Sequence, residues 1–215
     1  MNHLFEGPYI DYLLSRSPLS TAEVFGYGSS TMLFSSEDRL YRLTRQGCGH
    51  GFVARESALG NPHVPRIIKD FGPVAPSDED KEDFYWLAQV EWLQDLDPTD
   101  VVTQKLSALL IELTDDEPQI YGEELEHFAA CCIELANEEP ELRGLLTTLA
   151  TMAAFATEHQ AEADIKLDNI MLRPGTNELV LADPICDTYF EIDGAQRERM
   201  EQIRVYVLDE MAPRT

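Results

Sequence analysis

The sequence predicts an α+β fold, with strands and turns in the first half of the chain and helices at the start of the second half. Segment 39–44 (RLYRLT) alternates polar and apolar residues, as a half-buried strand does. Segment 142–159 instead repeats apolar residues at intervals of three and four, the period of an amphipathic helix. At 215 residues the chain can bury a substantial core, as one domain or as two small lobes that share a cleft.

The first half contains short elements separated by turn-forming residues. In order, we expect a helix over 5–14, a turn at 26–30 (GYGSS) within 24–34, a strand over 39–44, a glycine-rich loop over 47–51, a helix over 52–59 and a strand over 64–71. An acidic loop follows over 75–83. The aromatic segment 84–93 (FYWLAQVEWL) is the best candidate for a buried central strand.

Helices dominate the next part of the chain. We expect helices over 99–113, 123–137 and 142–159, then two short strands over 170–172 and 179–182 joined by an RPGTN turn, and a polar helix over 195–210. The apolar face of the first helix is predicted to comprise Val102, Leu106, Leu109, Leu110 and Leu113. That of the third comprises Leu142, Leu145, Leu146, Leu149, Met152, Ala153 and Ala156.

Acidic residues greatly outnumber basic ones. The chain has 16 Lys and Arg against 40 Asp and Glu, which gives a net charge of −24. This charge repels nucleic acids and anionic membrane surfaces, so we expect neither as a partner, and it attracts basic proteins. Solubility is the simpler explanation of the charge, and a decoy that mimics DNA for a basic protein is the alternative.

The remaining composition favours a cytoplasmic protein. The beginning of the chain lacks a signal-peptide pattern, and no uninterrupted apolar run approaches the ~20 residues that span a bilayer. The four cysteines form no C-x-x-C pair, which fits free thiols in a reducing compartment. Cys48 and His50 lack a second ligand pair nearby, so a zinc site is not expected.

The most informative segment is 163–184 (ADIKLDNIMLRPGTNELVLADP). Asp164, Lys166 and Asn169 occupy a loop after the long apolar helix, and a strand, a turn and a second strand then lead to Asp183. This order is expected to bring Asn169 and Asp183 together, with Asp164 and Lys166 beside them. Two oxygen ligands together with phosphate oxygens suit Mg²⁺, a carboxylate can accept a proton, and a lysine can neutralise a phosphoryl group.

The spacing D-x-K-x-x-N, then a hairpin, then D, resembles the catalytic loop and metal-binding segment of protein kinases. The closest similarity is to the short serine/threonine kinases made early in infection by some tailed bacteriophages, which share an N-I-M step and a D-P in place of D-F-G. The resemblance implies a minimal two-lobed protein-kinase-like fold, with a strand-rich N-terminal lobe over 1–93 and a reduced helical C-terminal lobe over 94–215. A phage origin would place the protein in the host cytoplasm.

The resemblance extends more weakly over the first half. Gly26, Gly28 and Ser29 are similar to a kinase glycine-rich loop, although Thr31 stands where the third glycine is usual. The resemblance implies that these residues cover the phosphates of ATP. It also implies that Arg42, on the next strand, pairs with Glu56 on a helix and touches the phosphates. Segment 91–93 would be the connection that cradles adenine.

Three departures from the kinase pattern stand out. Arg42 replaces the usual lysine, and arginine keeps the charge but not the compact ammonium geometry. Glu162 and Ala163 replace the histidine and arginine that precede the catalytic aspartate. Only residues 185–215 follow Pro184, too few for a long activation segment and a full helical lobe. We therefore expect either a minimal kinase or a relic that binds without catalysis.

The leading hypothesis is an ATP- and Mg²⁺-dependent serine/threonine protein kinase. Asp164 would deprotonate the acceptor hydroxyl and Lys166 would contact the γ-phosphate, while Asn169 and Asp183 would hold Mg²⁺. One rival is a weak or inactive kinase-like acidic protein that binds and inhibits a partner. A second rival is a small-molecule kinase, whose acceptor site usually needs a larger helical lobe. The expected partner is a protein substrate or target, and the oligomeric state of the chain itself is left open.

Simpler interpretations of single residues stay open at this point. Asp183 alone could be a turn former before proline. Arg42 could be an exposed strand residue, in which case Glu56 would be a surface helix residue.

Overall fold

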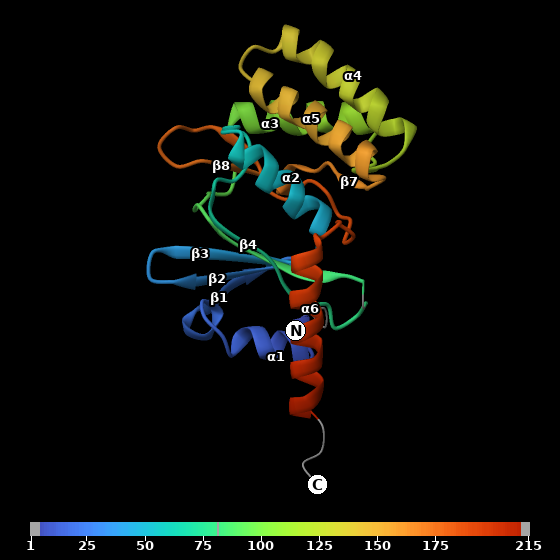
Figure 1. Ribbon diagram of the computed structural model, residues 1–215. Helices are drawn as coiled ribbons and strands as arrows, with labels where there is room; N and C mark the ends of the chain where they lie inside the picture. Colours follow the sequence, from blue (N-terminus) through green and yellow to red (C-terminus); the bar gives the residue numbers. More distant parts are fainter. Residues whose placement is uncertain (1–4, 81, 212–215) are drawn as a thin grey trace. The chain divides into compact units, whose positions relative to one another are not determined.

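The computed structural model describes residues 5–80 and 82–211 and has an α+β fold, with a five-stranded antiparallel sheet and, in the described residues, six α-helices (Figure 1). The chain divides into two compact units. Unit 1 comprises residues 1–50, 68–90 and 188–215, and unit 2 comprises residues 51–67 and 91–187. The predicted division into lobes at residue 93 stays a prediction.

Unit 1 contains the sheet. Its strands are β1 (Glu23–Tyr27), β2 (Thr31–Ser36), β3 (Arg39–Thr44), β4 (Ile67–Pro76) and β5 (Phe84–Val90), in the order β1-β2-β3-β5-β4. The expected strand over 39–44 is confirmed as β3. The expected buried aromatic strand is confirmed as β5, which lies between β3 and β4 and is buried along nearly its whole length.

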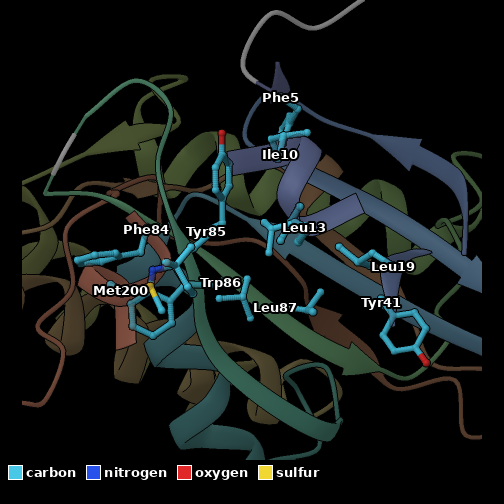
Figure 2. Close-up of a cluster of buried hydrophobic side chains, with 14 of the residues drawn as sticks. Phe5, Ile10, Leu13, Leu19, Tyr41, Phe84, Tyr85, Trp86, Leu87 and Met200 are labelled. Atoms are coloured by element: carbon cyan, nitrogen blue, oxygen red, sulfur yellow. The ribbon is translucent and has the colours of Figure 1, made fainter. Parts of the chain in front are cut away.

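Side chains on both faces of β5 are buried, because helical segments and loops of unit 1 cover both. The Tyr85 ring lies 6.1 Å from that of Phe5, whereas the next residue, Trp86, contacts the rings of His50 and Phe190. Figure 2 shows Tyr85 and Trp86 pointing to opposite sides of the strand, with Met200 of the C-terminal helix on the Trp86 side. This cluster also includes residues of α1 (Pro8–Leu14) and of α6 (Gly194–Met211).

The glycine-rich segment 47–51 is helical, so the expectation of a loop there is wrong. It forms the first turns of α2 (Gly47–Ala58), within which the boundary between the units falls. A Cβ at Gly47 would lie 2.5 Å from the Thr188 carbonyl oxygen and 2.8 Å from Trp86 Nε1. Here packing of buried residues such as Cys48 and His50 outweighs the low helix propensity of glycine.

The strand expected over 64–71 is displaced toward the C-terminus. β4 begins at Ile67 and runs to Pro76, into the segment expected to be an acidic loop. Pro73 and Pro76 are tolerated because β4 is an edge strand, where a missing N–H leaves no ladder bond unmade.

Unit 2 contains three longer helices that lie together in Figure 1: α3 (Val101–Thr114), α4 (Glu123–Glu138) and α5 (Arg143–His159). The whole predicted apolar face of α5 is buried. On α3 the buried face comprises Thr103, Leu106, Leu110 and Thr114. Val102 was expected on the buried face but is 40% exposed. The threonines extend the buried face, and the Thr114 hydroxyl is satisfied by donating to the Leu110 carbonyl at 3.0 Å.

Two short antiparallel pairs complete unit 2. The expected strands near 170 and 180 are confirmed as β8 (Ile170–Leu172) and β9 (Leu179–Leu181), which form one pair. The other pair joins β6 (Gln119–Ile120) to β7 (Ala163–Asp164). Sequence patterns did not predict β6 or β7, because two residues are too few to show a period.

Candidate functional site

Asp164 stands on a short loop that follows α5. The helix ends at His159, the following Gln160 adopts a left-handed conformation with φ of 54°, and the chain then enters β7. Beyond β7, a single 3₁₀ turn over Leu167–Asn169 leads directly into β8. Three of the predicted site residues therefore lie within one turn and one strand end.

The side chains of this loop converge on the Asp164 carboxylate. Lys166 Nζ donates to Asp164 Oδ2 at 2.5 Å, and Asn169 Nδ2 donates to the same oxygen at 3.1 Å and to the Asp164 carbonyl at 2.8 Å. The Asp164 side chain is 14% exposed, whereas that of Lys166 is 43% exposed. Both side-chain bonds to the carboxylate fall on Oδ2, so Oδ1 remains for a further donor.

Asp183 is placed beside this loop by the backbone on both sides of it. Ala182 N donates to the Asn169 carbonyl at 2.7 Å, and Asp164 N donates to the Pro184 carbonyl at 2.9 Å. Asp183, which is half-buried, thus lies between two residues that are bonded to the candidate loop. The hairpin β8–β9 sets this register, because Ile170 pairs with Leu181.

The donor atoms suit a hard cation. Asn169 is buried and uses its Nδ2 group for both bonds to Asp164, so its side-chain Oδ1 is the atom that would coordinate an ion. The Asp183 carboxylate is the second oxygen ligand that the sequence predicts, and oxygen ligands of these kinds are those that Mg²⁺ prefers. In the described part of the chain, no group of three or more His, Cys, Asp or Glu side chains could hold a metal.

Cys186 adds an inert thiol near the loop. Its Sγ donates to the Glu162 carbonyl at 3.5 Å. Burial, together with the charges of Glu162 and Asp164, raises the pKa of Cys186 to about 12. The thiol is therefore protonated near neutral pH and is a poor nucleophile there.

Arg173 fixes the turn that joins β8 to β9, and sequence reasoning missed it. The residue is buried, at 7% exposure, and pairs with Glu91 at 2.7 Å and with Glu178 at 2.6 Å. Its guanidinium group also donates to the backbone carbonyls of Pro62 and Val64. One arginine thus ties the hairpin to segment 62–64 and to the segment that follows β5.

These bonds shift the pKa values of the acidic partners. Burial alone would raise the pKa of Glu91, but hydrogen bonds from Arg173 and from the Arg66 N–H, with the charges of both arginines, hold that pKa below its ordinary value. The hydrogen bond from Arg173 likewise lowers the pKa of Glu178. Both carboxylates are therefore ionised near neutral pH.

The remaining predicted residues lie elsewhere. Gly26, Gly28 and Ser29 belong to the β1–β2 hairpin of unit 1, in which Gly28 N donates to the Thr31 carbonyl at 2.8 Å. Arg42 lies on β3 with 7% exposure, so its interpretation as an exposed strand residue is wrong.

Glu56 lies on α2 in unit 2. It is 6% exposed and accepts hydrogen bonds from Asn61 Nδ2 at 3.0 Å and from Arg55 Nε at 3.2 Å. Because Arg42 belongs to unit 1, the expected Arg42–Glu56 pair stays a prediction.

The two glycines of the hairpin are not required by its backbone. Neither Gly26 nor Gly28 has a positive φ, and a Cβ on either would meet no atom within 4 Å. Neither local conformation nor packing in the described residues therefore explains why these positions are glycine.

No protein-family model matches the chain, and no curated protein matches it. Among the described residues, no helix combines the length and the apolar character needed to cross a membrane.

Proposed function

We propose that the chain is an ATP- and Mg²⁺-dependent serine/threonine protein kinase with a minimal kinase-like fold, as its sequence resemblance implies. The observation that carries the proposal is the meeting of Asp164, Lys166 and Asn169 on one loop, with residues on either side of Asp183 bonded to it. A base, a cation and two oxygen ligands within one such cluster are the groups that phosphoryl transfer requires.

In this proposal Asp164 accepts the proton of the serine or threonine hydroxyl through Oδ1. The hydroxyl oxygen forms a bond to the γ-phosphorus, the bond from that phosphorus to the bridging oxygen breaks, and ADP leaves. Asn169 and Asp183 would hold Mg²⁺, which would supply positive charge to neutralise the phosphates.

Lys166 supplies the mobile charge of the site. Its ammonium group pairs with Asp164 and is 43% exposed. A lysine at this exposure can exchange its hydrogen bond to Asp164 for one to a γ-phosphate oxygen. The new bond would stabilise the transferred phosphoryl group, and the Asp164 carboxylate would become available to accept a proton.

The residues of unit 1 are assigned to the phosphates. Gly26 and Gly28 would let backbone N–H groups approach the phosphates closely, with Ser29 beside them, and Arg42 would supply a cation steadied by Glu56. The open space around both glycines supports this assignment.

A second candidate is a protein of the same fold that binds a basic partner without turnover. It is favoured by the charge of unit 2, in which 23 acidic residues stand against 6 basic ones, a net charge of −17. Such a surface attracts a basic protein whether or not the site transfers phosphate.

Phosphoryl transfer tests the proposal. Purified protein is incubated with γ-labelled ATP, Mg²⁺ and a cell extract, and labelled serine and threonine are identified after hydrolysis. We expect labelling by the wild type and by Asp168→Asn, an exposed carboxylate on the same loop, and a loss of about 10²-fold or more in Asp164→Asn.

The binding of ATP separates the two candidates. Asp164→Asn is expected to bind ATP as the wild type does, because a base contributes to the chemical step more than to ground-state binding. Labelling at equal rates by the wild type and Asp164→Asn would show that Asp164 is not the base. Wild-type protein that binds ATP but labels nothing favours the second candidate.

A further inference from the structure

A pocket of about 310 Å³ lies at the turn between α3 and α4 in unit 2. Its apolar lining comes from Ile120 and Phe128, which are 5% and 2% exposed, and from half-buried Leu113. The pocket is therefore a concave surface with a hydrocarbon floor, and it is formed by residues that the fold already holds in place.

The rim of the same pocket is acidic. Asp115 and Glu117 line it from the turn after α3, and Glu123 and Glu124 line it from the first turn of α4. In the part of the chain that the structure describes, no Lys or Arg forms an ion pair with any of these four carboxylates. Their charge is therefore not neutralised by neighbouring side chains.

The surrounding sequence offers no lysine or arginine either, and the one histidine in the lining, His127, contacts Cys131 Sγ through Nε2 at 3.6 Å. Segment 106–142 contains eleven Asp and Glu and no Lys or Arg. Lys105, which immediately precedes it, is engaged by Glu139 and Glu141 at the other end of α4. A lysine or arginine side chain that enters the pocket therefore does not come from the segment that forms it.

Hydrocarbon floor and acidic rim together match one kind of occupant. Lysine and arginine carry a long apolar stem and a charged head, and they bind best where the stem packs on apolar surface and the head meets carboxylates. A small cation would leave the floor uncovered, and an apolar side chain would leave the rim carboxylates without a partner.

The floor of the pocket is hydrogen-bonded to the candidate catalytic loop. Ile120 pairs with Ala163 and Gln119 pairs with Asp164 across the β6–β7 ladder, and Ile165 N donates to the Pro118 carbonyl at 2.6 Å. Paired strands lie about 4.8 Å apart, and an extended peptide advances about 3.3 Å per residue. An occupant of the pocket thus lies only a few residues along a bound peptide from Asp164.

We propose that this pocket binds a lysine or arginine side chain of the protein substrate, a few residues from the acceptor hydroxyl. That the bound side chain belongs to a substrate rests on the proposed kinase function, whereas the binding of a basic side chain by the pocket does not. The pocket would make the enzyme selective for basic sequences, in keeping with its overall charge.

Direct binding is tested with N-acetylarginine amide and its neutral isostere N-acetylcitrulline amide as probes. Backbone amide shifts of ¹⁵N-labelled protein are followed by NMR at rising probe concentration. We expect arginine, but not citrulline, to shift the amides of Gly122, Glu123 and Glu124. The double variant Glu117→Gln/Glu123→Gln should weaken this binding about fivefold or more.

The matched control is Glu126→Gln/Glu134→Gln. It removes the same charge from exposed positions of α4 that do not line the pocket, and Glu126 shares the first helical turn with Glu123. We expect it to bind arginine as the wild type does. Equal loss in both double variants, or shifts caused equally by Mg²⁺ alone, would overturn the pocket assignment.

Kinetics then separate this inference from the proposed function. Serine peptides with arginine or citrulline at each nearby position are offered with ATP and Mg²⁺. A higher kcat/KM for arginine at one position, lost in the pocket variant alone, is the expected result. If peptides are phosphorylated without a preference for arginine, and arginine causes no amide shifts, the pocket assignment is wrong. If arginine shifts the amides but no peptide is phosphorylated, the kinase function is wrong and the binding site remains supported.

Discussion

Arg42 combines a full charge with a buried position on a central strand. It is 7% exposed and lies on β3 between Leu33 of β2 and Ala88 of β5 in the ladder. Arginine is a common phosphate ligand because its planar guanidinium group donates several hydrogen bonds, so an arginine on the strand next to the glycine hairpin is a candidate ligand for phosphate.

We predict that Arg42→Ala weakens ATP binding about tenfold, because one charge-assisted contact is lost. Arg42→Lys should preserve or raise the affinity, since lysine keeps the charge as a compact ammonium. Arg39→Ala, at an exposed position of the same strand, is the control. Unchanged affinity in both Arg42 variants, measured by calorimetry, would remove Arg42 from the nucleotide site.

Glu91 provides a second test at a single residue. Its folded-state pKa is held below the ordinary value, so it stabilises the fold above its unfolded-state pKa of about 4.3, and this stabilisation is lost as the pH falls through the folded-state pKa. Glu91→Gln should therefore cost about 3 kcal/mol near pH 7 and less near pH 3, which lies below the unfolded-state pKa. Urea unfolding at both values checks this, with exposed Glu134→Gln as control. An equal cost at both values contradicts the ion pair.

The Arg173 cluster also shows what sequence reasoning could not reach. Arg173 precedes Pro174 and Gly175 in a turn motif, where arginine is typically solvated. Its partner Glu91 is 82 positions away, and no local pattern connects them. In contrast, Asp164, Lys166 and Asn169 lie within six residues, so their grouping was predictable from spacing alone.

Among the elements, the β1–β2 hairpin contains two glycines that its own backbone conformation and packing do not require. Gly26 and Gly28 have ordinary φ values and open space where a Cβ would stand. Alanine at either position should therefore be accommodated in the protein without ATP. If the backbone approaches the phosphates of ATP at this hairpin, the added Cβ should obstruct their binding.

We predict that Gly26→Ala/Gly28→Ala leaves thermal stability unchanged within about 0.5 kcal/mol. The same double variant should weaken ATP binding by about tenfold. Gly194→Ala is the matched control, because Gly194 also has open space and an ordinary φ. If the double variant binds ATP with the affinity of the wild type, Gly26 and Gly28 form an ordinary turn and take no part in ATP binding.

Helices and strands were predictable from sequence where one repeat of apolar residues extends over many positions. α5 keeps its apolar repeat through 17 residues, and its buried face agrees with the pattern. α2 was misjudged at its start because tertiary packing, and not propensity, makes Gly47 helical. The start of β4 depends on its pairing with β5, a long-range contact that its own residues do not encode.

At the scale of the whole molecule, the two compact units interleave along the chain. Residues 188–215, which include α6, belong with the sheet of unit 1, although 97 residues of unit 2 separate them from β5. Residues that precede and follow unit 2 in sequence therefore share one core, a feature that composition and periodicity do not reveal.

In the proposed function, Asn169 and Asp183 would hold Mg²⁺ with ATP beside Asp164. Isothermal calorimetry of ATP binding, with and without Mg²⁺, tests it in the wild type, Asp183→Asn and the exposed-loop control Asp168→Asn. We predict metal-dependent binding in the wild type and the control, and at least about tenfold weaker binding in Asp183→Asn. Equal affinity in Asp183→Asn, or equal binding without Mg²⁺, would contradict the assignment of Asp183 as a Mg²⁺ ligand.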